Sequence, residues 1–83
     1  MSRKDKLLDR LFALPKDFTW EELTAVMNHC GYTLCSGSGS RRKFYHVQNG
    51  WLVILHEPHP GRILKAYQLR EVAGHLKQNG FKP

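Results

Sequence analysis

The stretch RRKFYHVQNGWLVIL, residues 41–55, decides the fold of this 83-residue chain. β-branched and aromatic residues stand on both sides of Asn49-Gly50, a dipeptide that strongly favours the tight turn of a β-hairpin. The second arm, residues 51–55, is apolar at every position, as strands covered on both faces are. We therefore expect an antiparallel hairpin whose second strand is the most buried strand of the sheet.

The first arm of the hairpin alternates between two faces, because successive side chains of a strand point to opposite sides. Arg42, Phe44 and His46 share one face, and Lys43 and Tyr45 share the other. A further β-prone segment, residues 32–35, precedes the hairpin and is followed by the glycine- and serine-rich residues 36–40. The sequence therefore predicts a three-stranded antiparallel sheet with a loop of small residues before its most basic strand.

Two amphipathic helices flank the predicted sheet. The first, Trp20 to Cys30, begins at a capping box formed by Thr19 and Glu22. The second, Ala66 to Gln78, repeats its apolar residues at the i, i+3, i+4, i+7 spacing of a helix with one buried face. From Thr19 onward the predicted order is therefore α-β-β-β-α.

An additional helix is predicted over Arg3 to Leu14, where the apolar residues form one stripe and Pro15 follows the end. With it the chain has the order α-α-β-β-β-α of a small α+β protein. No repeat and no long linker divides the chain. We expect one domain over residues 1–83, with residues 1–16 as an N-terminal addition to a core of residues 19–81.

Composition limits the classes of function that the chain can serve. It has no apolar run of about 18 residues and no signal-peptide h-region, so we expect a cytoplasmic protein without a membrane span. Thirteen Lys and Arg residues stand against seven Asp and Glu, and the formal net charge is +6. This excess favours a polyanionic partner: nucleic acid, acidic lipid or an acidic protein. The alternative is a basic surface that serves solubility alone.

Metal, cofactor and disulfide chemistry are not expected. Cys30 and Cys35 would close only a short loop, and we expect two packed, reduced thiols. His56, His59 and the two cysteines would offer four zinc ligands, but no paired C-x-x-C motif occurs and Cys30 belongs to an apolar helix face. The sequence also has no phosphate-binding P-loop, nucleophile triad or carboxylate pair.

Several ordered motifs together resemble the HicA toxin family. They are Gly39-Ser40-Arg41-Arg42-Lys43-Phe44, Pro58-His59-Pro60-Gly61 and a closing helix that ends near Gly80. The order α-β-β-β-α is also that of the double-stranded-RNA-binding domain. The resemblance implies such a fold, cleavage of mRNA by a ribosome-independent endonuclease, and neutralisation by a HicB antitoxin. It also implies that Arg41 stands where many family members have their catalytic histidine.

Cleavage of RNA without a metal requires a base for the ribose 2′-hydroxyl, a cation for the phosphate in the transition state, and an acid for the leaving 5′-oxygen. Arg41, Arg42 and Lys43 suit the second role, because guanidinium groups bind phosphate oxygens in pairs and lysine adds a point charge. Arg41 cannot be the base, since arginine stays protonated. The other expected RNA contacts are the hydroxyls of Ser38 and Ser40 and the ring of Tyr45.

A histidine is the natural substitute for the base, because its ordinary pKa is near 6.5. His46 ranks first because it lies on the basic strand and shares a face with Arg42. His59 ranks second because two prolines hold it in a rigid loop, and His56 lies near the end of the third strand. The alternative for each is a structural or surface histidine.

We therefore expect the toxin of a toxin–antitoxin pair, which binds and cleaves mRNA as a metal-independent endoribonuclease and is bound by a HicB-like antitoxin. One alternative is a non-catalytic RNA-binding module that has lost cleavage with the family histidine. The other is an interaction domain whose basic face binds an acidic protein.

Overall fold

The computed structural model of the chain describes residues 3–37, 39, 41–58 and 61–81. The predicted order α-α-β-β-β-α is confirmed, and the protein has a small α+β fold. Its elements are α1 (Arg3–Phe12), α2 (Trp20–His29), β1 (Tyr32–Ser36), β2 (Arg41–His46), β3 (Leu52–His56) and α3 (Ala66–Gln78).

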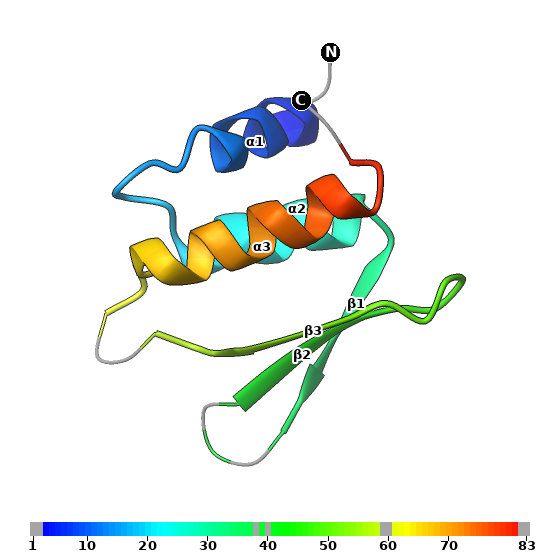
Figure 1. Cartoon of the computed structure of the whole chain (residues 1–83). Coiled ribbons are helices and arrows are strands. Elements are labelled where there is room, and N and C mark those ends of the chain that lie inside the picture. Colours follow the sequence, from blue (N-terminus) through cyan, green and yellow to red (C-terminus); the bar gives the residue numbers. More distant parts are fainter. Residues whose placement is uncertain (1–2, 38, 40, 59–60, 82–83) are drawn as a thin grey trace.

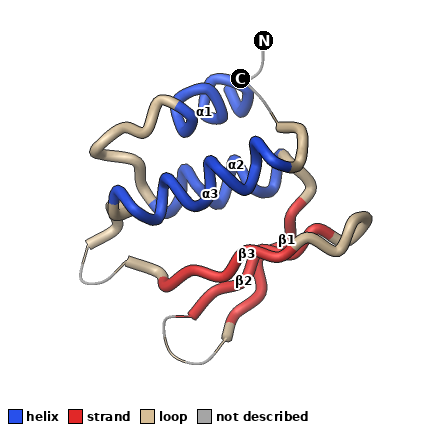
Figure 2. The backbone as a smooth tube through the Cα atoms, viewed as in Figure 1, coloured by secondary structure: helices blue, strands red, loops and turns tan. Residues whose placement is uncertain are grey.

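The elements lie in three layers (Figure 1). α2 and α3 occupy the middle layer, between the sheet on one side and α1 on the other (Figures 1 and 2). α1 contacts both of these helices. Buried residues of all three layers form one core, which includes Leu11, Leu23, Phe44 and Leu69. All described helices therefore lie on the same side of the sheet, and its other face is uncovered.

The sheet is antiparallel with the order β1-β2-β3, so the basic strand is central. The β2–β3 hairpin closes where His46 N donates to Trp51 O at 2.9 Å and Gly50 N donates to His46 O at 2.7 Å. Gly50 has a φ of 72°, the left-handed conformation for which an Asn-Gly turn is suited. The turn prediction is confirmed. The hairpin turn sets the register of the two strands. Tyr45 is opposite Leu52 next to the turn, and Arg41 is opposite His56 at the end of the hairpin away from the turn.

The expectation that residues 51–55 form a strand covered on both faces is wrong. Val53 and Leu55 are buried, but Leu52 is 47% exposed and Ile54 is 41% exposed. The cause is that the described helices all cover the same face of the sheet, since an antiparallel sheet covered on one side leaves alternate residues in water. Leu52 and Ile54 are thus apolar side chains at the surface, and core packing does not explain them.

α2 begins at the predicted capping box. Glu22 N donates to Thr19 Oγ1 at 3.1 Å, and Thr19 N donates to Glu22 Oε1 at 3.0 Å. The helix ends one residue earlier than predicted, at His29, with Cys30 as the C-cap residue. Gly31 follows with a φ of 92°, the left-handed conformation that ends many helices. α2 is therefore fixed by local signals at both ends.

α1 ends two residues earlier than predicted, at Phe12. Leu14 N donates to Leu11 O at 3.0 Å, and Leu14 has a φ of 54°. A non-glycine residue in this left-handed conformation closes the helix before Pro15. The buried Leu11 is the part of α1 that enters the core.

Candidate nucleic-acid interface

The predicted site residues on β2 divide between the two faces of the sheet. Phe44 and His46 are buried under the helices, and Arg42 points to the same side, as the alternation of the strand predicts. Arg41, Lys43 and Tyr45 point to the uncovered side. The predicted residues Ser38, Ser40 and His59 lie outside the described residues. The remaining predicted residues therefore do not form one surface.

Arg42 is engaged in a network within the protein. Its Nε donates to Glu57 Oε1 at 3.1 Å, and its Nη1 donates to the carbonyl oxygens of Gly39 and Arg41 at 2.8 and 2.9 Å. Both partners of the ion pair keep only 23% of their side chains exposed. Arg42 thus links the β1–β2 loop to the residue that follows β3. This geometry gives Arg42 a positioning role for the loop and for the backbone of Arg41.

The network continues to the start of α2. Arg62 lies 2.7 Å from Glu57 Oε2 through its Nη1 and 2.6 Å from Glu21 Oε1 through its Nη2. The hydrogen bond from Arg62 lowers the pKa of Glu21, and the same bond raises the pKa of Arg62. The chain of charges Arg42–Glu57–Arg62–Glu21 therefore connects β2 to the first turn of α2.

His46, the first-ranked candidate base, is a core residue. Only 6% of it is exposed. Its ring centroid lies 5.1 Å from that of Tyr32 and 4.7 Å from that of Trp51. Its Nδ1 accepts a hydrogen bond from Asn49 N at 3.2 Å. These contacts support the hairpin turn, and the burial of the ring gives no support to a role in proton transfer with RNA.

The uncovered side of the sheet, which we call the open face, carries a different set of groups. Arg41 and Tyr45 are exposed, and Lys43 lies in register between Cys35 of β1 and Ile54 of β3. The β3 strand adds an exposed histidine, His56, directly across from Arg41. The open face consists of Thr33, Cys35, Arg41, Lys43, Tyr45, Leu52, Ile54 and His56.

The sequence contained the signal for this pairing. The Asn49-Gly50 turn fixes the hairpin register, and counting outward from it places residue 41 opposite residue 56. The candidate bases were ranked from the sequence by which face of β2 each residue occupies, and this criterion favoured His46. Sequence reasoning therefore missed that His56 is the histidine nearest to Arg41 along the sheet.

The glycine-containing loop before β2 is accessible. Gly37 and Gly39 are exposed, and Gly37 N donates to Arg41 O at 2.8 Å. α1 packs against the helices on the side away from the sheet (Figure 1). The additional helix therefore does not cover the described part of this loop or the open face.

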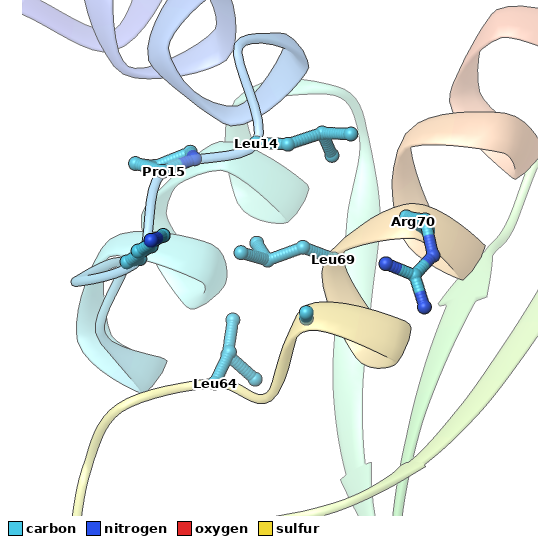
Figure 3. Close-up of a pocket in the computed structure, with 7 residues that line it drawn as sticks. Leu14, Pro15, Leu64, Leu69 and Arg70 are labelled. Atoms are coloured by element: carbon cyan, nitrogen blue, oxygen red, sulfur yellow. The ribbon is translucent and has the colours of Figure 1, made fainter.

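A pocket of about 230 Å³ lies elsewhere, between the α1–α2 connection and the start of α3. Leu64 and Leu69 point into it (Figure 3). Its lining contains no histidine, cysteine or carboxylate, and its charged side chains are the cations Lys16 and Arg70. The lining residues are Leu14, Pro15, Lys16, Leu64, Ala66, Leu69 and Arg70.

Metal-binding groups do not come together in the described part of the chain, where no three His, Cys, Asp or Glu side chains form a metal site. Cys30 and Cys35 are unbridged thiols. Cys30 is packed as predicted, and burial raises its pKa to about 11. The prediction that Cys35 is packed is wrong, because Cys35 is exposed on the open face. Within the same residues, no helix is long and apolar enough to cross a membrane.

Comparison with known proteins identifies the family. The family described as "HicA toxin of bacterial toxin-antitoxin" matches residues 20–81, from the first residue of α2 to the residue after Gly80. Searches of curated proteins and of solved structures found no match. The family match covers more than half of the chain, includes the whole sheet and leaves out α1. The resemblance seen in the motifs is confirmed, and the chain belongs to the HicA toxin family.

Proposed function

We propose that this HicA toxin binds mRNA in the cytoplasm and cleaves it as a metal-independent endoribonuclease. Membership of the family makes the chain the toxin of a toxin–antitoxin system and implies a HicB-type antitoxin as its partner. The charge of the protein and the groups around Arg41 support mRNA as the target. The formal net charge of +6 suits a polyanionic substrate.

One observation carries the proposal. Arg41 is exposed at the start of β2, beside the glycine-containing loop, and its backbone is held by hydrogen bonds from Arg42 and Gly37. No ion pair joins Arg41 to another described residue, so its guanidinium is available to an external anion. A pre-positioned guanidinium stabilises the additional negative charge of a phosphate in the transition state. Ser38, Ser40, Lys43 and Tyr45 complete the proposed RNA contacts.

The proposed cleavage also needs a proton acceptor. Among the two histidines ranked first from sequence, His46 is buried by aromatic rings, so His59 is the better of the pair for this site. His56, which lies opposite Arg41 in the sheet, is a third candidate.

Cleavage of RNA by the purified protein in excess EDTA tests the proposal. We expect wild-type protein to cut a single-stranded RNA, and we expect Arg41→Ala to lower the rate by about 100-fold or more, as the loss of a transition-state donor does. Arg70→Ala, which removes an exposed cation of α3, is the matched control and should cleave at the wild-type rate. RNA that stays intact with folded wild-type protein contradicts the proposal.

A non-catalytic RNA-binding module is the second candidate. The observation that favours it is the arginine at the position of the family histidine. Such a module binds RNA with an affinity that falls steeply with salt, because each phosphate contact releases counterions. Salt-dependent binding without any cleavage product, measured on the same preparations, would select this candidate.

A further inference from the structure

The strand residues of the open face include cations and no carboxylates. Arg41 and Lys43 lie on it, and none of the strand residues that form it is acidic. The acidic side chains that the structure describes lie on the helices, in the α1–α2 connection, or in the ion network at Glu57. A surface that carries cations and no carboxylate attracts a polyanion. A second copy of the chain would place like charges against each other here.

The open face also exposes aromatic and aliphatic side chains beside its cations. Tyr45 and Ile54 are each 41% exposed, and Leu52 is 47% exposed. Tyr45 and Leu52 are neighbours in register, as are Lys43 and Ile54. An exposed ring beside cations on a sheet is a platform for the stacking of unpaired bases. Bases in a duplex are already stacked and paired, so a duplex cannot use such a platform.

Arg41 and His56 form a cross-strand pair at one end of this platform. Residues directly opposite each other in an antiparallel sheet have Cβ atoms about 5 Å apart on the same face. The backbone of His56 is anchored, because the buried Gln68 of α3 donates from Nε2 to His56 O at 2.9 Å. The guanidinium and the imidazole can therefore reach one phosphate from two adjacent strands, with the strand end held by α3.

We propose that the open face takes single-stranded RNA and that His56, beside Arg41, transfers protons at the phosphate that is cleaved. This inference rests on the proposed function and names the substrate class and the missing base of that site. Tyr45 stacks on an unpaired base, Arg41 and Lys43 hold phosphate oxygens, and His56 replaces the buried His46 as the base.

The chemical step balances without a metal or an oxidant. The imidazole of His56 accepts the proton of the ribose 2′-hydroxyl while the 2′-oxygen forms its bond to phosphorus. The bond between phosphorus and the 5′-oxygen breaks, and its electron pair stays on that oxygen, which takes a proton from solvent. The imidazolium later returns its proton to solvent. The products are a 2′,3′-cyclic phosphate and a 5′-hydroxyl end.

The kinetic arm of the test compares wild-type protein, His56→Gln and His56→Ala with His29→Gln, which alters an exposed histidine of α2. The substrate is a short single-stranded RNA in EDTA, and the cyclic phosphate end is the readout. We expect both His56 variants to lower kcat by about 100-fold or more, the usual contribution of a general base, while His29→Gln keeps the wild-type rate. Thermal unfolding of each variant checks its fold. Wild-type kcat in the His56 variants would overturn the assignment.

The binding arm uses the same RNA with 2′-deoxy sugars, which cannot be cleaved, and a duplex of the same length. We expect Tyr45→Ala to weaken single-strand binding by about 10-fold and the His56 variants to change Kd by less than about twofold. Equal affinity for the duplex, or no effect of Tyr45→Ala, would overturn the single-strand platform. If these variants instead lose only the HicB-type antitoxin, the open face is a protein interface and the inference is wrong.

The two arms separate the failure of this inference from the failure of the proposed function. If wild-type protein binds the single strand through Tyr45 but cuts nothing, the proposed nuclease activity and the role of His56 are wrong. The proposed single-strand binding site on the open face is then still supported. Wild-type protein that cuts RNA at a rate independent of His56 keeps the nuclease and removes only the histidine assignment.

Discussion

Gly31 and His46 fit together without space for a further atom. A Cβ placed on residue 31 would lie 2.9 Å from His46 Nε2, and Gly31 has a φ of 92°. The residue after the C-cap of α2 therefore lies directly against the imidazole, which also packs against Trp51. This relationship explains why a histidine is buried at the end of the basic strand: it fills the space between the helix end and the hairpin turn.

Gly31→Ala should destabilise the protein by at least about 2 kcal/mol, because it adds a clash with a packed ring to an unfavourable backbone conformation. Chemical denaturation measures this loss. Gly80→Ala is the matched control, since Gly80 has a similar φ of 89° but nothing within 4 Å of the added Cβ, and it should cost less. Gly74→Ala in α3 should stabilise the protein by up to about 1 kcal/mol. Equal losses for Gly31→Ala and Gly80→Ala would show that the contact with His46 is unimportant.

Arg42→Met and Glu57→Gln should have the same sign of effect on RNA cleavage. If Arg42 positions the loop through Glu57, removing either partner releases the loop and lowers kcat. If Arg42 instead binds RNA directly, Arg42→Met weakens RNA binding while Glu57→Gln leaves it intact or strengthens it. A double-mutant cycle on the free energy of unfolding should give a coupling of about 1 kcal/mol for this partly buried pair.

The parts of the fold that sequence predicted correctly are those with local signals. The Thr19–Glu22 capping box fixes the start of α2, and Asn49-Gly50 fixes the hairpin, because both act within a few residues. The exposure of Leu52 and Ile54 depends on which face of the sheet the helices cover. A strand that is apolar at every position does not indicate which of its two faces is covered.

In the candidate site, too, local sequence patterns predicted some features, and contacts between distant parts of the chain determined the others. The alternation of β2 correctly placed Phe44 and His46 together, but the burial of His46 depends on Tyr32 and Trp51, which come from other parts of the chain. The ion pair of Arg42 joins residues 15 positions apart, and no local pattern marks Glu57 as its partner. The sequence therefore identifies the charged and aromatic groups on the basic strand, and the surrounding structure decides which of those groups meet solvent.

Leu14→Gly should give a more stable protein than Leu14→Ala by about 1 kcal/mol. The Cβ of alanine is sterically unfavourable in the left-handed conformation, and glycine has no Cβ. Both variants remove the same side chain, which is 43% exposed, so the comparison isolates the backbone. Ala13→Gly is the control one residue earlier, at a position without a positive φ, and it should destabilise the protein. Equal stability of the two Leu14 variants, measured by urea unfolding, would contradict the strained conformation.

His75 should make the stability of the protein depend on pH. Its Nε2 lies 2.7 Å from the hydroxyl of Tyr32 and 3.3 Å from Asn79 Nδ2, and both groups can donate to a neutral imidazole. Burial lowers the pKa of His75 below its ordinary value of 6.5, and burial also raises the pKa of Tyr32 to about 12, so the hydroxyl remains a donor. The folded state therefore favours the neutral ring.

The sign of the effect follows from proton binding. Below about pH 6.5 the unfolded chain takes up a proton at His75 more readily than the folded chain does, so the free energy of unfolding falls as the pH falls. Above that pH the ring is neutral in both states, and the contribution is fully present. We expect urea unfolding of His75→Gln to show a weaker decline between pH 7 and pH 5 than the wild type. Tyr32→Phe, which removes the hydroxyl but keeps the ring, should lower stability at pH 7 by about 1 kcal/mol. Parallel pH profiles for wild type and His75→Gln would show that the buried imidazole does not couple protonation to folding.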